Sequence, residues 1–105
     1  MLLLHAMNTK TISDAIPTIQ KELIEKTQFP QEEVLLDKGM VERRNYEAQR
    51  AMKLGNSFKD KVKIVFEDVE GIKIVETTVW AVTDRYLMLK RGMMIPLNRI
   101  YEIII

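Results

Sequence analysis

Hydrophobic and polar residues follow two different periods along this chain of 105 residues. From about Ser13 to Leu54, apolar residues recur every three or four positions, which is the period of an amphipathic helix. From about Lys61 to the C-terminus, apolar and polar residues alternate, which is typical of half-buried strands. The pattern therefore predicts an α+β protein with helices first and strands afterwards, joined near Gly55 and Asn56.

Two helices are expected in the first half. An apolar stripe of isoleucine, alanine and leucine marks the first, with Asp14 as its N-cap and Pro17 in its first turn. The second spans Pro30 to Leu54, and its stripe is thin and rich in small residues, which predicts a helix lying across a surface. We expect Gly55 to end this helix because glycine readily adopts the left-handed conformation.

Five strands are expected in the second half, over residues 61–67, 72–82, 86–91, 93–97 and 103–105. The second is long, and its alternation changes phase near Val75 and Glu76, which predicts a bulge or bend. Such short strands suit a strongly bent antiparallel sheet that closes into a small SH3-like barrel. We expect a single domain overall, with a helical segment (residues 1–56) packed on a five-stranded barrel (residues 57–105).

Composition narrows the classes of function. The chain has no cysteine and one histidine, His5, which excludes disulfides, thiolate metal sites and a histidine-based triad within one chain. The acidic residues form no spaced pair typical of acid and base catalysis, and no glycine-rich phosphate loop is present. The sequence predicts a protein that is not an enzyme, with no catalytic residues, metal, cofactor or small-molecule substrate.

The formal net charge is +1, and basic and acidic residues are spread over both halves. This balance differs from the basic excess that is common in nucleic-acid-binding proteins. The opening Met1–Ala6 is shorter than the apolar region of a secretory signal, and no run reaches the roughly 20 apolar residues of a membrane span. We expect a cytoplasmic protein with no membrane partner. Met1 and Met7 are both candidate start residues.

The strand half resembles the Sm/LSm family of RNA-binding barrels over about residues 61–105. Thr-Asp-Arg-Tyr-Leu-Met-Leu (residues 83–89) is similar to the end of the family's first motif, with Asp84 in its aspartate position. Ile-Pro-Leu-Asn-Arg-Ile-Tyr-Glu-Ile (residues 95–103) is similar in spacing to the second motif. The resemblance implies an Sm-like barrel that self-associates through its last two strands and binds single-stranded RNA. The helical half resembles small uncharacterised bacterial proteins, which implies no function.

The sequence differs from the family at two RNA-contacting places. Met88 stands where the family has an asparagine that reads the base, and Pro96-Leu97 stands where the second motif has Arg-Gly. Two functions therefore stay open: an RNA-binding Sm-like oligomer, and a protein-interaction or assembly module with the same barrel and no nucleic-acid role. A continuous basic or aromatic rim favours the first function, and a rim of mixed charge favours the second.

Turns and strand ends supply the candidate RNA contacts. Trp80 is expected in the core, as is usual for a single tryptophan in an apolar strand, whereas Tyr86 can stack on a base. Asp84 is expected to shape its turn by accepting hydrogen bonds from backbone amides. Ordinary solvation is the alternative explanation of the basic side chains there. The candidate RNA-binding residues are Arg85, Tyr86, Lys90, Arg91 and Arg99.

The last two strands supply the candidate contact between subunits. Met93 and Met94 are adjacent, so one of them must face away from the core of a regular strand. The C-terminal isoleucines would add to an exposed apolar edge, which monomers rarely carry. The candidate interface residues are Met93, Met94, Ile103, Ile104 and Ile105. We expect a homo-oligomer.

Overall fold

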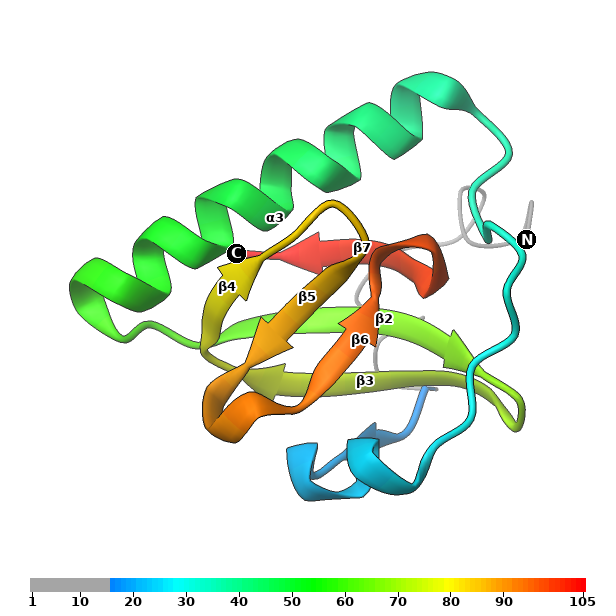
Figure 1. Ribbon diagram of the computed structural model, residues 1–105, viewed down its shortest axis with the longest axis horizontal. Helices are drawn as coiled ribbons and strands as arrows, with labels where there is room; N and C mark the ends of the chain where they lie inside the picture. The colour runs from blue at the N-terminus through cyan, green and yellow to red at the C-terminus, as the bar shows by residue number, and fades with distance from the viewer. Residues whose placement is uncertain (1–15) are drawn as a thin grey trace.

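The computed structural model describes residues 16–105, which form one long helix and two open sheets (Figure 1). The elements, in chain order, are β1 (Thr18–Ile19), the 3-10 helix η1 (Lys21–Lys26), α3 (Lys38–Phe58), β2 (Val62–Asp68), β3 (Gly71–Thr77), β4 (Val79–Val82), β5 (Tyr86–Leu89), η2 (Lys90–Gly92), β6 (Met94–Pro96), η3 (Leu97–Arg99) and β7 (Ile100–Ile104). The predicted α+β class is confirmed. The strands of the described residues do not close into a barrel, so the finer expectation of a closed five-stranded cylinder is not met.

Sheet A contains four strands in the order β1-β3-β2-β7. Strands β2 and β3 form an antiparallel hairpin whose register runs from Val62 opposite Thr77 to Asp68 opposite Gly71. Strand β7 pairs antiparallel with the other side of β2, and the short β1 pairs parallel with β3. The first and last strands of the described chain are therefore the two opposite edges of sheet A.

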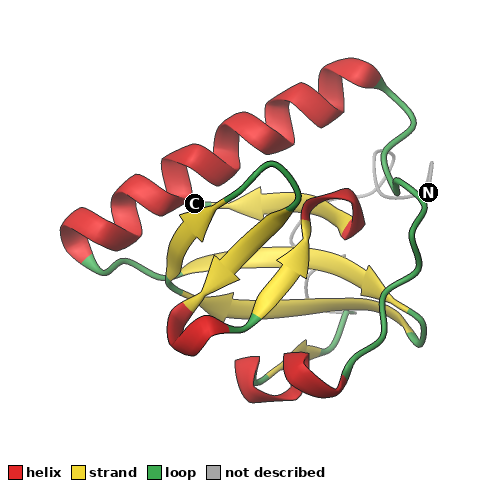
Figure 2. Cartoon of the chain, in the orientation of Figure 1, coloured by secondary structure: helices red, strands yellow, loops and turns green. Residues whose placement is uncertain are grey.

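Sheet B contains β4, β5 and β6 in that order, and all of its pairings are antiparallel (Figure 2). Thr78 is the only residue between β3 and β4, so the chain passes directly from one sheet to the other. The long second strand expected from the sequence is thus split between two sheets.

The irregularity expected within that strand is present, but it lies further along the chain. Val75 and Glu76 are paired in register with Ile64 and Lys63. The register instead shifts between Val79 and Ala81, which leaves the intervening residue of β4 as a β-bulge.

Helix α3 lies across the outside of the molecule and packs against β4 and β7 (Figure 1). Its N-cap is Asp37, whose carboxylate accepts hydrogen bonds from the amides of Gly39 (2.7 Å) and Met40 (3.3 Å). The packed face carries small residues, including the fully buried Ala48 and Ala51. The prediction of a helix that lies across a surface is confirmed.

Gly55 does not end α3, as the sequence pattern predicts, but lies inside it. The helix continues to Phe58 and is closed by Lys59, which has a left-handed φ of 57° and donates its N–H to the Gly55 carbonyl (3.0 Å). A Cβ atom on Gly55 would lie 2.1 Å from the Val79 carbonyl oxygen. Glycine is needed here because the helix approaches the backbone of β4 so closely.

The first half contains less helix than the sequence pattern predicts. Instead of a first helix, the described residues form β1 and η1, and the Pro17 carbonyl accepts a hydrogen bond from the amide of Ile74 in β3 (2.9 Å). The predicted N-cap, Asp14, lies outside the described residues. Residues 27–37, which we call the strap, contain neither helix nor strand, so α3 begins only after Asp37.

The core fills the space between the two sheets, α3 and η1. Phe66 of β2 is fully buried, and the ring of Phe29 from the strap packs on it with ring centroids 6.0 Å apart. The largest fully buried side chains are Phe66, Ile64, Ile74, Leu87, Leu89, Ile95, Ile100, Val75 and Val79.

A buried arginine of α3 ties the strap to sheet A. Arg44 donates to both carboxylate oxygens of Glu33 (2.6 and 2.9 Å) and to the Ile100 carbonyl (3.2 Å). Burial alone would raise the pKa of Glu33, but hydrogen bonds from Arg44 and from the backbone hold it below its usual value. No helix within residues 16–105 is both long enough and apolar enough to cross a bilayer.

Candidate nucleic-acid interface

The strands of sheet B contain no charged residue. Their sequences are Val-Trp-Ala-Val in β4, Tyr-Leu-Met-Leu in β5 and Met-Ile-Pro in β6. Alternation turns one set of side chains inward, where Val79, Leu87, Leu89 and Ile95 are fully buried. The outward-facing side chains, which we call the platform, are Trp80, Ala81, Tyr86, Met88, Met94 and Pro96.

The strand register makes neighbours of the platform residues. Tyr86 is directly opposite Pro96, and Met88 is opposite both Met94 on one side and Ala81 on the other. Cross-strand partners share one face of a sheet, so their side chains lie beside each other. The result is a continuous outward surface of aromatic, methionine and small apolar side chains.

Trp80 is the residue that the structure places most differently from the prediction. Its side chain is expected in the core, but it is 49% exposed. The cause is the bulge: Trp80 is the extra residue between Val79, which pairs with Leu89, and Ala81, which pairs with Met88. The bulge turns the indole ring outward onto the platform, where Tyr86 is also 40% exposed.

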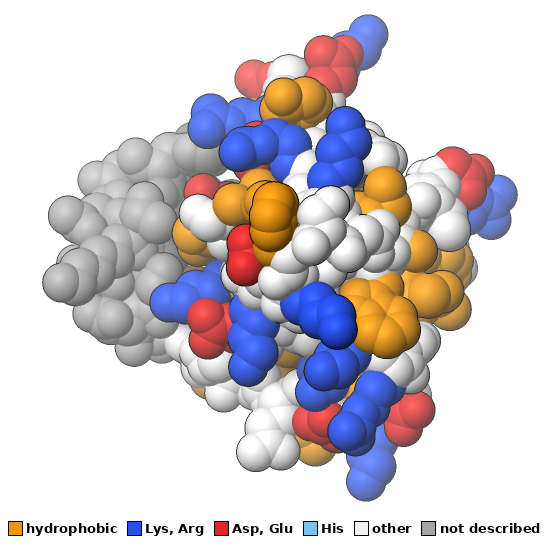
Figure 3. All heavy atoms as spheres, turned by 90° about the vertical axis from the view of Figure 1, so that its left-hand side faces the viewer, with side chains coloured by type: hydrophobic (Ala, Val, Ile, Leu, Met, Phe, Trp, Pro, Cys, Tyr) orange, Lys and Arg blue, Asp and Glu red, His pale blue; other side chains and the backbone are white. Residues whose placement is uncertain are grey.

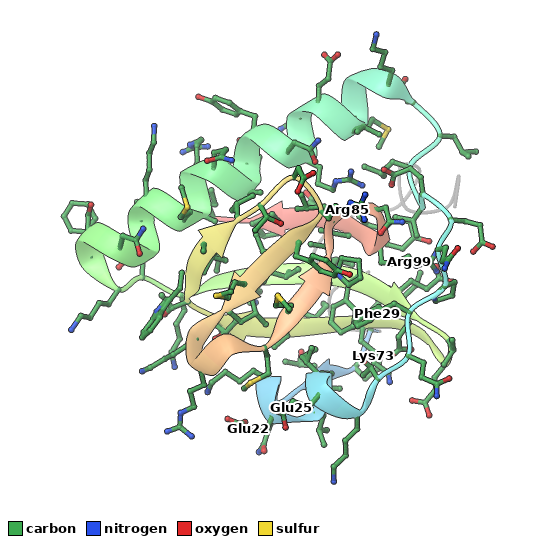
Figure 4. The ribbon with its side chains drawn as sticks, in the orientation of Figure 1. Glu22, Glu25, Phe29, Lys73, Arg85 and Arg99 are labelled. Carbon is green, nitrogen blue, oxygen red and sulfur yellow. The ribbon has the colours of Figure 1, made fainter. Side chains whose placement is uncertain are left out.

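The turn at one end of β5 carries Arg85. Thr83, not Asp84, organises this turn: the Thr83 hydroxyl oxygen accepts hydrogen bonds from the amides of Arg85 (3.1 Å) and Tyr86 (2.9 Å). Within residues 16–105, the Asp84 carboxylate accepts no hydrogen bond and forms no ion pair. The Arg85 side chain is exposed beside Tyr86, as the sequence predicts (Figure 4).

The other end of β5 carries three exposed basic residues, Lys59, Lys90 and Arg91, which we call the basic end. Thr78 joins them, since its carbonyl accepts from the Lys90 amide (3.1 Å) and its hydroxyl donates to the Lys59 carbonyl (3.4 Å). Arg91 lies in a tight turn with a left-handed φ of 70°. Figure 3 views the side of the molecule where α3 ends and shows Lys and Arg side chains gathered around an exposed hydrophobic side chain.

The cations around the platform have no close acidic partner. Within residues 16–105, no ion pair involves Arg85 or a side chain of the basic end. Asp60 follows Lys59 in the chain and Asp84 precedes Arg85, and Glu22 on η1 lies along the β6 side (Figure 4). A hydrogen bond from Lys21 lowers the pKa of Glu22, and the charge of Arg91 lowers it further to a smaller extent.

Arg99 does not belong to this surface. It is only 5% exposed, and its guanidinium donates to the carbonyls of Glu67 (3.1 Å) and Glu32 (2.7 Å) between β2 and the strap. The predicted continuous rim of five residues is therefore not formed. Lys90 and Arg91 lie at one end of β5, Arg85 and Tyr86 lie at the other, and Arg99 is in the interior because the strap covers it.

The predicted subunit contact is also divided between interior and surface. Met93 (7% exposed) and Ile103 (4% exposed) point into the core, so their side chains are not available to a partner. Met94 and Ile105 are exposed and Ile104 is half-buried, so only one of the adjacent methionines faces the core, as expected. Strands β6 and β7 end their sheets, but η1 lies against β6 and α3 against β7.

A second surface feature is a hollow of about 410 Å³ between η1 and the turn that joins β2 to β3. Three of its charged groups are paired, since Lys73 donates to Asp68 (2.8 Å) and to Glu70 (2.6 Å), and Lys26 also lines it. In the described part of the chain, no three histidine or acidic side chains are arranged to hold a metal ion. Of these two surfaces, only the platform has exposed aromatic rings.

Two features of the platform escape the sequence argument. Lys59, at the basic end, is distant in sequence from the strands of sheet B and comes close to them because α3 packs against β4. Trp80 reads as a core residue because its strand is apolar. The absence of charge from residues 79–82, 86–89 and 94–96 is, however, visible in the sequence and could have indicated an exposed apolar face. No protein-family model, curated protein or solved structure matches this chain.

Proposed function

We propose that this protein is a non-catalytic module that binds single-stranded RNA on the platform of sheet B. The observation that carries the proposal is a charge-free sheet face with two exposed aromatic rings and exposed cations at both ends. Proteins bind single strands by stacking bases on aromatic rings and by pairing phosphates with Lys and Arg. Both kinds of group occur here in one surface.

The dimensions of sheet B suit a short stretch of an unpaired strand. A β-strand rises about 3.3 Å per residue, so the two ends of β5 lie about 10 Å apart. A strand that runs along β5 would place bases over Trp80, Met88 and Tyr86. Its phosphates would meet the basic end on one side and Arg85 on the other.

We further propose that the two sheets are an open form of an Sm-like barrel in a cytoplasmic protein. The strand order supports this: β7-β2-β3 continues through Thr78 into β4-β5-β6, as in a five-stranded barrel with a long, bent second strand. Strands β6 and β7 are then the two end strands, and Met94, Ile104 and Ile105 are the residues left for contact with a second copy. The RNA contacts would lie on the outer face of the sheet.

A protein-interaction module is the second candidate function. Aromatic and methionine side chains are enriched at the centres of protein interfaces, and the platform exposes Trp80, Tyr86 and Met94. Under this function, the cations would pair with acidic residues of a protein partner. The two functions differ in whether RNA binds at low salt.

Fluorescence anisotropy of a labelled oligouridine about nine nucleotides long tests the proposal. Trp80→Ala should weaken binding about tenfold or more, because stacking contributes about 1–3 kcal/mol per base. The matched control is Tyr46→Ala, which removes an aromatic ring that is 64% exposed on α3, away from the platform. This control should bind as the parent protein does.

Two outcomes would contradict the proposal. Equal losses in the Trp80 and Tyr46 variants would show that the platform is not the binding surface. No binding at about 50 mM salt, together with a mass in solution larger than one chain, would favour the protein-interaction module instead.

A further inference from the structure

We infer that the platform binds unpaired nucleic-acid strands without distinguishing their bases or their sugar, so that single-stranded DNA is as good a ligand as RNA. This inference rests on the proposed function and names its substrate class. Reading a base requires hydrogen-bond donors and acceptors aimed at its edge.

The side chains of the platform offer almost no hydrogen-bonding atoms. Of the six, only Trp80 and Tyr86 carry a polar atom suited to a strong hydrogen bond, one indole N–H and one hydroxyl. The others are alanine, methionine and proline. An aromatic ring stacks on any base, since every base has a π-face.

The backbone of sheet B does not supply the missing groups. Strand β5 is central and pairs with β4 on one side and with β6 on the other, which occupies its amides and carbonyls. Helix α3 packs against β4, and η1 packs against β6. The backbone therefore has no free edge in the middle of the platform where a base could be read.

The buried polar side chains do not supply a free donor or acceptor for a base either. Among residues 16–105, no buried side-chain nitrogen or oxygen lacks a hydrogen-bond partner. A site that recognises one base, or the 2′-hydroxyl of RNA, would need a positioned donor or acceptor that the ligand satisfies. The Asp84 carboxylate, which has no partner among the described residues, lies in the exposed turn before β5 and outside the platform. The remaining contacts come from Lys59, Arg85, Lys90 and Arg91, and phosphates are common to RNA and DNA.

The same features disfavour a duplex. In a duplex the bases are stacked on each other and cannot lie on Trp80 or Tyr86. Only the phosphate contacts would remain, and these are few. We therefore expect discrimination between paired and unpaired strands, but none between sequences.

Anisotropy titrations with labelled strands of equal length test the inference on the full chain. The ligands are oligouridine, oligoadenosine, oligocytidine, oligothymidine as DNA, and a blunt duplex. We expect the affinities of the four single strands to agree within about tenfold, less than positioned base contacts usually produce, and the duplex to bind more weakly than each. Tyr86→Phe, which removes only the hydroxyl, should bind all four as the parent does, whereas Tyr86→Ala should bind all four less well.

The outcomes separate the inference from the proposed function. A preference of more than tenfold for one base or for RNA, or a loss of affinity for one base in Tyr86→Phe, would overturn the inference and leave RNA binding standing. Tighter binding of the duplex would also overturn it. Binding of vesicles that contain anionic lipid, with no binding of any strand, would overturn the proposed function itself.

Discussion

The two sheets of this protein use their outward faces in opposite ways. The strands of sheet A carry charged residues that interact with one another: Lys73 bridges Asp68 and Glu70, and Glu67 accepts a hydrogen bond from the Tyr101 hydroxyl. Burial and that hydrogen bond raise the pKa of Tyr101. Sheet B carries no charge on its strands, and the cations at its ends have no partner among the described residues. These charged groups of sheet A are paired within the chain, whereas the cations at the ends of sheet B are not paired within the described residues.

This difference separates stability from binding. Interactions that are complete within the folded chain contribute to the free energy of unfolding and are lost when it unfolds. Exposed apolar rings and unpaired cations add little to that free energy, and they remain available to a ligand. Substitutions near sheet A should therefore lower stability with little effect on strand binding, and substitutions on the platform should do the reverse.

The largest effect is expected where the two sheets meet, because a change there should lower both stability and strand binding. Gly55→Ala would bring a Cβ atom to 2.1 Å from the Val79 carbonyl, so α3 and β4 must move apart. We expect a loss of about 3 kcal/mol in the free energy of unfolding in urea and weaker strand binding, because Trp80 follows Val79 directly. Gly39→Ala is the matched control, since its Cβ meets only the Asp37 carboxylate, at 3.1 Å. A Gly55 variant as stable as the control would refute the close approach.

The next largest effect is expected at Arg99, which is buried between β2 of sheet A and the strap. Arg99→Gln removes the guanidinium that donates hydrogen bonds to the carbonyls of Glu67 and Glu32. Leaving these partly buried carbonyls without their donor should lower the free energy of unfolding by about 2 kcal/mol. Strand affinity, measured below the unfolding transition, should not change. Arg43→Gln, an exposed arginine on α3, should change stability by less than about 0.5 kcal/mol. A loss of affinity in the Arg99 variant would contradict this prediction and would indicate that Arg99 contributes to strand binding.

The segments of the fold that local pattern controls are predictable from the sequence. The division into two halves, the hairpin of β2 and β3, and the helix on the surface all follow from periodicity and small residues. The placement of Met93 and Met94 on opposite faces follows from strand alternation alone. Each of these depends on residues that are close together in sequence.

The features that depend on distant contacts are not predictable in this way. Gly55 looks like a helix end, and only the approach of β4 gives it another role. Arg99 looks like a solvated turn residue, and only the strap makes it a buried anchor. Trp80 looks like a core residue until a bulge shifts the register by one position. The predicted continuous rim depends on such distant contacts. The sequence therefore predicts the positions of its residues less accurately than it predicts the strands that carry them.

A pH titration of stability tests whether the charged groups of sheet A act as argued. Burial alone would raise the pKa of Asp68, but the hydrogen bonds from Lys73 and from the amides of Glu70 and Gly71 lower it below its usual value. A carboxylate with a lowered pKa stabilises the fold above its unfolded pKa of about 4, and this contribution is lost as the pH falls through the folded value. The urea concentration at the midpoint of unfolding should therefore decrease as the pH is lowered below about 4. It should decrease less steeply in Asp68→Asn.

The control for this titration is Glu70→Gln, because the Glu70 side chain is 75% exposed. It should keep most of the acid dependence of the parent protein. An Asp68→Asn curve parallel to that of the parent would contradict the assignment of Asp68 as a source of stability.

Salt dependence tests the cations of sheet B. If Lys59, Arg85, Lys90 and Arg91 each contact a phosphate, the slope of log K against log salt should be about −3, since a single strand contributes about −0.7 per contact. The double variant Lys90→Gln, Arg91→Gln should bring the slope to about −1.4. The matched double variant Lys38→Gln, Arg43→Gln, at the other end of α3, should leave it unchanged. Equal slopes in the two variants would show that net charge, not the basic end, controls binding.

The smallest effect is expected at Glu22, the acid on η1. It distinguishes the electrostatic effect of one nearby charge from the effect of the net charge of the protein. Glu22 lies close enough to Arg91 for the two charges to interact, so it weakens the attraction of the basic end for phosphate. Glu22→Gln should strengthen binding about twofold at low salt and not at all at high salt, where such interactions between exposed charges are screened. Glu47→Gln removes a half-buried acid that is paired with Arg50 on α3, and it changes the net charge equally. Because the Glu47 carboxylate is hydrogen-bonded to Arg50 and not to the basic end, its loss should leave the affinity unchanged. An equal gain in both variants would mean that net charge alone, and not the position of Glu22, controls the affinity.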